Sequence, residues 1–120
     1  MDEKKNISEL KEIVKDFCDD RDWDQFHNVK DLSLALSIEV SELLELFRWK
    51  TNDELDEFFK DEFKREKFED ELSDVFYFVL RIAQKNDVDL SEAFERKMKK
   101  NCIKYPIQKA KGSNKKYTEL

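Results

Sequence analysis

Apolar residues recur every three or four positions along most of the chain, which is the spacing of one face of an α-helix. Residues 7–20 and 31–50 predict two amphipathic helices, with Asp31 as the N-cap of the second. Residues 21–28 break the period and predict an ordered loop. The two apolar stripes consist of Ile7, Leu10, Ile13, Val14, Phe17 and Cys18, and of Leu36, Val40, Leu43, Leu44 and Phe47.

The second half of the chain continues this helical pattern. A short helical stretch follows Asp53, and a long helix is predicted over residues 64–85. Asp89, followed three residues later by Glu92, resembles a capping box that opens a last helix, which stops before Pro106. No segment shows the alternating pattern of a β-strand, and no repeat or interdomain linker is evident.

These elements predict an all-α protein with one helical domain, residues 1–106, and a polar, basic C-terminal tail, residues 107–120. The domain contains four main helices. Their apolar faces are wide and the loops are few for a chain of 120 residues. We therefore expect a four-helix bundle whose core is completed by oligomerisation.

The composition excludes several classes of function. A single glycine, Gly112, cannot build a P-loop or a Rossmann phosphate turn. The net charge of −6 disfavours binding to nucleic-acid polymers, and no apolar run approaches a membrane span. One histidine and two isolated cysteines, Cys18 and Cys102, disfavour a structural zinc site. Two reduced thiols in a cytoplasmic protein are favoured, and a disulfide between them stays open.

Charge is distributed unevenly along the chain. Residues 31–74 contain 15 acidic and 6 basic side chains, whereas residues 96–120 contain 9 basic and 1 acidic. The middle of the chain could bind cations and the end anions. Solvated helix faces and a basic tail explain the same distribution.

Acidic residues mark the edge of the buried face on two helices. Glu39 and Glu42 are three residues apart on one helix, with Glu45 continuing the row toward solvent, and Glu71 and Asp74 repeat the spacing on the next long helix. If these helices pack side by side, Glu39, Glu42, Glu71 and Asp74 converge. Close carboxylates repel unless a cation lies between them, and oxygen ligands favour Mg²⁺ or Mn²⁺. Ordinary exposed positions in an acidic chain are the alternative.

The last predicted helix carries the complementary charge. Lys97, Asn101 and Lys104 share one face, and Tyr105 follows. A triphosphate could lie between this face and a metal, although an exposed basic stripe has the same pattern. Trp23, His27 and Trp49 could stack on or hydrogen-bond to a nucleobase, with core packing as the alternative for each aromatic ring.

Taken together, these residues resemble the MazG-like all-α nucleoside triphosphate pyrophosphohydrolases, and most closely their dCTP pyrophosphatase branch. The resemblance covers almost the whole chain, and its specificity comes from ordered segments rather than from single ExxE pairs. The segments are residues 21–27 (RDWDQFH), 39–50 (EVSELLELFRWK), 71–75 (ELSDV), 97–106 (KMKKNCIKYP) and 116–120 (KYTEL).

The resemblance implies hydrolysis of dCTP or modified cytosine deoxynucleotides to the monophosphate and pyrophosphate, in a dimer or tetramer. It assigns the metal to the carboxylates at positions 39, 42, 71 and 74, and proton transfer to Glu45 or Glu42. It places Lys97, Asn101, Lys104 and Tyr105 at the phosphates or sugar. The base pocket would contain Trp23, His27 and Trp49.

The chain departs from the family pattern at three positions. Ile38 and Ser41 replace glycines around the first glutamates, which could narrow the site. Phe78 stands where the branch often has tyrosine, with Tyr77 beside it, so a hydroxyl contact to the nucleotide is in question. The alternatives to a dCTP pyrophosphohydrolase are the same reaction on other triphosphates, a non-catalytic bundle that binds nucleotides or proteins, and a purely structural oligomer.

Overall fold

The computed structural model describes all residues, 1–120, and each of its regular elements is helical. The absence of strands confirms the predicted all-α class. The elements are α1 (Ile7–Asp20), α2 (Val29–Glu45), α3 (Asn52–Lys60), α4 (Glu62–Lys85), α5 (Leu90–Lys104) and α6 (Ile107–Ala110), with 3₁₀ turns at Asp24–Phe26 and Tyr117–Glu119.

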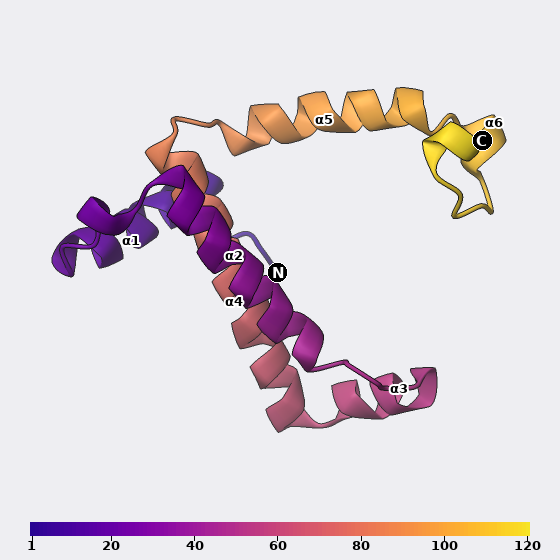
Figure 1. Cartoon of the computed structure of the whole chain (residues 1–120), viewed down its shortest axis with the longest axis horizontal. Coiled ribbons are helices and arrows are strands. Elements are labelled where there is room, and N and C mark those ends of the chain that lie inside the picture. The colour runs from indigo at the N-terminus through magenta and orange to yellow at the C-terminus, as the bar shows by residue number, and fades with distance from the viewer. The chain divides into compact units, whose positions relative to one another are not determined.

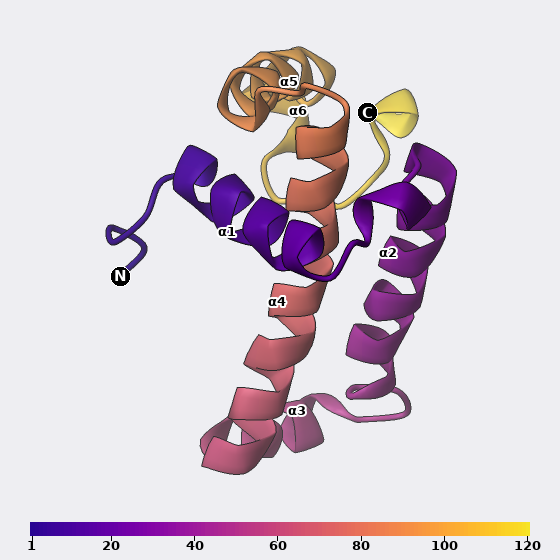
Figure 2. The same cartoon turned by 90° about the vertical axis from the view of Figure 1, so that its left-hand side faces the viewer.

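The chain divides into two compact units, Met1–Asp87 and Val88–Leu120. In the first unit α4 is the central element, because α1, α2 and α3 each pack against it. Helices α2 and α4 lie side by side and run in opposite directions (Figure 1 and Figure 2). This antiparallel pair brings acidic positions that are about thirty residues apart in sequence onto neighbouring surfaces.

The core of the first unit is small. Only six apolar residues are buried, namely Val14, Cys18, Leu32, Phe58, Leu80 and Ala83. A cluster of four phenylalanines, Phe47, Phe58, Phe59 and Phe68, packs where α3 meets α4, with ring centroids 5.0–5.8 Å apart. Helix α2 in turn leaves apolar side chains in solvent, including Ile38 (58% exposed) and Leu44 (65% exposed).

Side-chain caps start the five longer helices. Asn6 forms a complete capping box with Glu9 at α1, and Asn28, Thr51, Asp61 and Asp89 each accept a hydrogen bond from the backbone N–H three residues on. Each cap satisfies a backbone donor that the helix itself leaves unpaired. These local contacts explain why the predicted helices form where they do.

The predicted bounds of the second helix were wrong at both ends. Asn28, not Asp31, is the N-cap, because the Asn28 side chain accepts from the Asp31 N–H at 2.8 Å. The helix ends at Glu45 instead of Lys50, and tighter turns follow. Trp49 then adopts a left-handed conformation with φ of 67°, which ends the helical path before α3 begins.

The second unit consists of α5 followed by the C-terminal residues. Asp89 caps α5, as predicted, by accepting from the Glu92 N–H at 2.9 Å. The predicted tail contains α6 and the 3₁₀ turn at Tyr117–Glu119. The Tyr117 ring lies 4.8 Å from Lys104 Nζ and 6.1 Å from the Tyr105 ring. These contacts attach the tail to the end of α5.

Candidate metal centre and adjoining pocket

Three carboxylates from two helices meet between α2 and α4. One oxygen each from Glu39, Glu42 and Glu71 lies within 4.8 Å of the others. Glu39 and Glu42 are one turn apart on α2, and the antiparallel packing of α4 brings Glu71 beside them. The side-by-side packing expected from the carboxylate pattern is therefore present for these three residues.

Two of these oxygens are buried without a partner. Glu39 Oε2 and Glu71 Oε2 are shielded from solvent and have no hydrogen bond. Burying a carboxylate oxygen without a hydrogen bond is costly, and a positive charge at this place would lower that cost. All three residues offer oxygen ligands, the donor set that hard divalent cations prefer.

The pKa values of two residues in this cluster are raised because the carboxylates lie close together and are partly buried. Burial, and then the neighbouring Glu42, Asp74 and Glu71, raise the pKa of Glu39 to about 7. Burial and the nearby carboxylates of Glu42 and Asp74 also raise the pKa of Glu71. Both shifts result from negative charge held together in a partly desolvated place. A cation at this position would relieve the repulsion.

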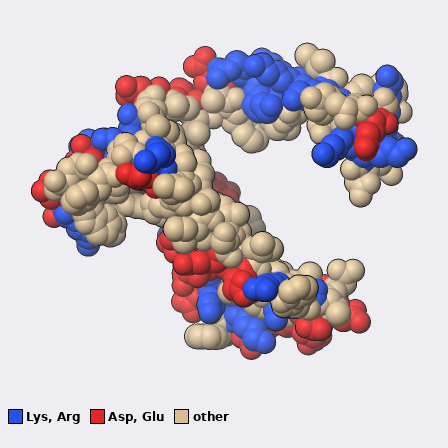
Figure 3. All heavy atoms as spheres, in the orientation of Figure 1, with Lys and Arg blue, Asp and Glu red and all other residues tan.

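The other two acidic residues predicted at the site do not belong to this trio, although Asp74 is near enough to raise the pKa of Glu39 and Glu71. Asp74 lines the pocket described below together with Glu39. Glu45 is exposed at the end of α2, where its Oε1 atom lies 3.6 Å from Arg48 Nη1. In Figure 3, acidic side chains gather over part of the α2–α4 pair, and basic side chains line α5 in the second unit.

A pocket of about 280 Å³ adjoins the acidic cluster. One part of its wall is acidic, and the rest is aromatic. The lining residues are Phe17, Trp23, His27, Glu39, Asp74, Tyr77 and Phe78. An aromatic cavity with carboxylates at one side suits a flat apolar ring that carries a charged or metal-bound group.

The aromatic wall is built from two helices and the loop between α1 and α2. The rings of Phe17 and Trp23 meet edge to face, with centroids 5.6 Å apart, and Phe17 meets Tyr77 at 6.0 Å. The hydroxyl of Tyr77 lies 3.1 Å from Cys18 Sγ, so this oxygen is engaged inside the unit. Phe78, which replaces the expected tyrosine, contributes only its ring.

His27 lines the pocket, and its surroundings disfavour the charged form of its ring. Burial and the positive charge of Arg81 hold the pKa of His27 below its usual value. Its Nδ1 atom accepts a hydrogen bond from Arg81 Nε at 2.9 Å. The sequence indicated His27 but not Arg81, because an arginine on a helix normally predicts an exposed position.

Several predicted residues lie elsewhere. Trp49 is 86% exposed, its ring stacked near Arg48, and it does not line the pocket. Ile38 and Ser41 do not line it either, and the Ser41 hydroxyl donates to the Ser37 carbonyl within α2. The basic and polar residues predicted at the phosphates, Lys97, Asn101, Lys104 and Tyr105, belong to the second unit, and their role stays a prediction.

Sequence reasoning missed Phe17 and Tyr77 as pocket residues. Phe17 was assigned to the apolar stripe of the first helix, which is where core residues are expected. A signal was available, since the stripe reaches the loop that carries Trp23 and His27. An aromatic residue at the end of a helix next to an aromatic loop predicts such a wall.

Comparison with known proteins identifies the family of the chain. The model of the MazG-like family matches residues 34–120, which include every carboxylate of the cluster. The chain belongs to the MazG-like family. Human dCTP pyrophosphatase 1 is 40% identical over 114 residues, which is 95% of this chain and 67% of the human protein. The mouse dCTP pyrophosphatase 1 is 38% identical over the same shares of the two chains.

A solved structure of a similar protein supports the fold. The crystal structure of a pyrophosphatase from Archaeoglobus fulgidus superposes with a TM-score of 0.77 at 38% sequence identity. The superposition covers 83% of this chain and 92% of the archaeal one. None of the helices in this MazG-like chain has both the length and the hydropathy needed to cross a bilayer.

Proposed function

We propose that this MazG-like chain is a Mg²⁺-dependent pyrophosphohydrolase that converts dCTP, or modified cytosine deoxynucleotides, to the monophosphate and pyrophosphate. The observation that carries the proposal is the convergence of Glu39, Glu42 and Glu71 beside an aromatic pocket. Its dCTP pyrophosphatase relatives motivate the choice of base and suggest a role in cleansing the nucleotide pool.

The acidic cluster fits a divalent cation. Glu39 and Glu71 each have a buried oxygen without a partner, and Glu42 completes an all-oxygen donor set. We assign Mg²⁺ to these three residues and to Asp74 at the adjoining wall, with Mn²⁺ as a substitute. Mg²⁺, when bound, would supply positive charge that offsets the charge of the phosphate oxygens and eases the loss of a proton from water.

The protein itself would position the nucleotide and remove a proton. The pocket wall of Trp23, His27 and Phe78 would hold the base, so that the phosphates extend toward the carboxylates. Water attacks the α-phosphorus in line and pyrophosphate leaves. Glu42 and Glu45 are the two candidates to accept the proton of that water. Lys97, Asn101, Lys104 and Tyr105 would contact the phosphates or sugar.

A homo-oligomer, dimer or tetramer, is part of the proposal. The exposed apolar residues of α2 and the small core of the first unit support it, since a second copy would bury such a face. The exposed Trp49 side chain would join the base pocket through such an assembly. We place the enzyme in the cytoplasm, which suits its two free cysteines.

One assay tests the reaction. Purified protein is incubated with Mg²⁺ and a panel of deoxynucleoside and nucleoside triphosphates, and pyrophosphate and orthophosphate are measured separately. We expect pyrophosphate and the monophosphate, with the highest kcat/KM for dCTP or a modified cytosine triphosphate. Activity centred on another base would favour the same reaction on a different nucleotide. Release of orthophosphate would refute the proposed reaction, and no turnover at all would refute it in favour of a non-catalytic binding bundle.

A further inference from the structure

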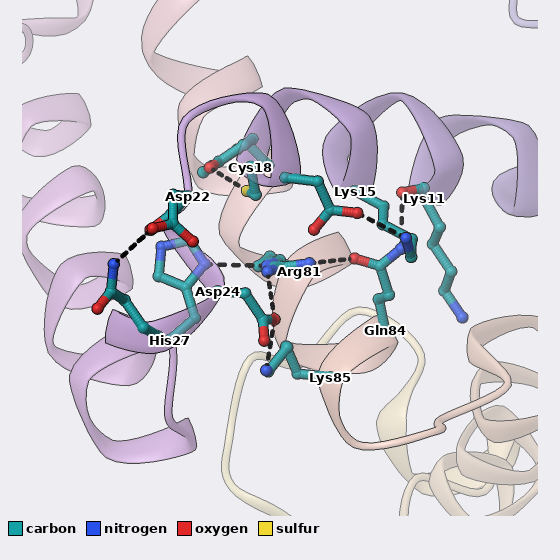
Figure 4. A network of polar contacts seen from close by, with 12 residues as sticks. Lys11, Lys15, Cys18, Asp22, Asp24, His27, Arg81, Gln84 and Lys85 are labelled. Carbon is teal, nitrogen blue, oxygen red and sulfur yellow. Dashed lines mark hydrogen bonds and ion pairs between the residues drawn. The ribbon is translucent and has the colours of Figure 1, made fainter.

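Arg81 is the one charged residue buried in the protein, and only 1% of its surface is exposed. Figure 4 shows its guanidinium at the centre of a polar network in the first unit. Nη1 donates to Gln84 Oε1 at 2.6 Å, and Nη2 donates to Asp24 Oδ1 at 2.9 Å. Nε donates to His27 Nδ1 at 2.9 Å. The three nitrogens thus have three different partners on α4 and the α1–α2 loop.

The partners of Arg81 are themselves held in place. Gln84 Nε2 donates to the Lys11 carbonyl of α1 at 3.0 Å, and Lys85 Nζ donates to Asp24 Oδ1 at 2.6 Å. The guanidinium therefore has little freedom to rotate. A rigid donor placed beside an imidazole fixes the orientation of that ring.

The contact with Arg81 also determines where the proton of His27 lies. A guanidinium has only donors, so the ring nitrogen that faces it must present a lone pair. When Nδ1 accepts in this way, the neutral imidazole carries its hydrogen on Nε2. His27 lines the aromatic pocket, and its Nε2 has no hydrogen-bond partner within the protein. A donor is thus left available at the pocket.

Burying a guanidinium to hold a loop is an expensive solution. An apolar residue of similar volume often gives equal or greater stability at a buried charge position. Asp24, the only acidic partner of Arg81, has a side chain that is 57% exposed, so it compensates the buried charge incompletely. An apolar residue could supply none of the three donors, and among them the Nε donor is the one that reaches a pocket residue, His27.

We propose that Arg81 is a positioning residue that holds His27 as an Nε2–H donor for the occupant of the pocket. The occupant must present a hydrogen-bond acceptor there. For the substrate class of the proposed function, on which this part rests, the acceptor is the O2 or N3 edge of cytosine. In uracil and thymine N3 carries a hydrogen, so a donor that faces N3 opposes these bases, whereas a donor that faces only O2 would accept all three.

Nuclear magnetic resonance tests the tautomer directly, because His27 is the only histidine in the chain. In the ¹⁵N-labelled protein, a long-range ¹H–¹⁵N correlation should show an unprotonated Nδ1 and a protonated Nε2. The variant Arg81→Met should lose this single tautomer and show an exchanging mixture. The control Lys85→Met removes the other cation on Asp24 without touching His27, and should keep the wild-type pattern.

Several outcomes would overturn the assignment. A protonated Nδ1 or an averaged mixture in the wild-type protein contradicts the assignment of the tautomer. Because this spectrum is recorded on the wild-type protein, it tests the assignment even if Arg81→Met fails to fold. An unchanged tautomer in folded Arg81→Met would reduce Arg81 to a structural support. Titration of the wild-type protein with dCMP should shift the Nε2–H signal, and no shift at saturation would refute the donor role.

Steady-state kinetics distinguish an Arg81 that positions His27 for the substrate from an Arg81 that only stabilises the fold. We expect Arg81→Met to raise KM for dCTP about threefold to tenfold, the scale of one lost hydrogen bond, with a smaller change in kcat and weaker discrimination against dUTP. Arg81→Lys keeps the charge but lacks the Nε donor, so it should not restore KM. An unchanged KM with a lower kcat contradicts the proposal. Absence of pyrophosphate release would refute the proposed reaction, and the tautomer measurement would stand independently.

Discussion

A carboxylate oxygen of Glu39 on α2 lies within 4.8 Å of one of Glu71 on α4, and each residue also has a buried oxygen without a hydrogen bond. Two acids in this relationship destabilise the protein when both are charged. A cation bound between them, as proposed above, would relieve this repulsion. The consequences can be measured in catalysis and in stability.

Glu71→Gln should abolish turnover without unfolding the protein. The substitution keeps the shape of the side chain but removes a negative charge from the cluster, so Mg²⁺ affinity should fall and kcat should drop by at least roughly 100-fold. Titration calorimetry with Mg²⁺ and a pyrophosphate-release assay measure the two effects. Glu69→Gln is the matched control, since Glu69 is exposed on the same helix and pairs with Arg65. Full activity in Glu71→Gln would mean that the metal site lies elsewhere.

The pKa of Glu39 predicts how stability depends on pH. Because the folded protein raises this pKa to about 7, it binds a proton more readily than the unfolded chain does. The contribution of Glu39 is therefore most favourable at low pH and is lost as pH rises from about 4.5 to about 7. The measurement is thermal unfolding of the wild type and of Glu39→Gln without metal. The Tm of the variant minus the Tm of the wild type should increase as pH rises through this range.

Mg²⁺ should reverse this loss. The stabilisation by saturating Mg²⁺ should be larger at pH 8, where the carboxylates are charged, than at pH 5, where protons compete with the ion. Equal Tm shifts by Mg²⁺ at both values would argue against binding at Glu39 and Glu71.

Trp49 is predicted to serve substrate binding and not the fold of the first unit. Its side chain is 86% exposed and its φ of 67° is unfavourable for any residue with a Cβ. Trp49→Ala and Trp49→Gly should both raise KM for dCTP or alter base preference. Trp49→Gly should unfold at a higher temperature than Trp49→Ala, because glycine tolerates this conformation at little cost. An unchanged substrate profile in both variants would remove Trp49 from the base pocket.

The two cysteines should differ in reactivity. Cys18 is fully buried and contacts the Tyr77 hydroxyl, whereas Cys102 on α5 is exposed. A colourimetric thiol reagent should label one cysteine in the native protein and two after denaturation. Cys102→Ser should abolish the native reaction, and Cys18→Ser should leave it intact. Rapid reaction of both native thiols would indicate that α1 opens readily.

Sequence was most informative where the determinants are local. The predicted range of α1 matches the structure, because a regular apolar stripe follows an N-cap, Asn6, and its matching Glu9. The start of α2 was misplaced because both Asn28 and Asp31 are good cap residues, and only the backbone decides between them. Its end was misplaced because the apolar period continues to Phe47 after the helical backbone has stopped.

The site was predictable only in part, for the same reason. Helical spacing placed Glu39, Glu42 and Glu71 on matching edges, and the packing of α2 on α4 then brought them together. Helical arithmetic could not find the contact between Arg81 and His27, which are 54 residues apart and partly in a loop. A buried guanidinium is recognised only from its partners, and these lie on α4 itself and on the distant α1–α2 loop.

The cluster also has a mechanical consequence. The acidic residues of the cluster come from α2 and α4, and the short helix α3 lies between these two helices in the sequence. An ion bound by the cluster would therefore hold α2 against α4, as a covalent cross-link would. The rigidity of this helix pair would then depend on free Mg²⁺, and backbone amides along α2 and α4 would exchange with solvent faster under chelation. An enzyme built this way would be most rigid when it is ready to react.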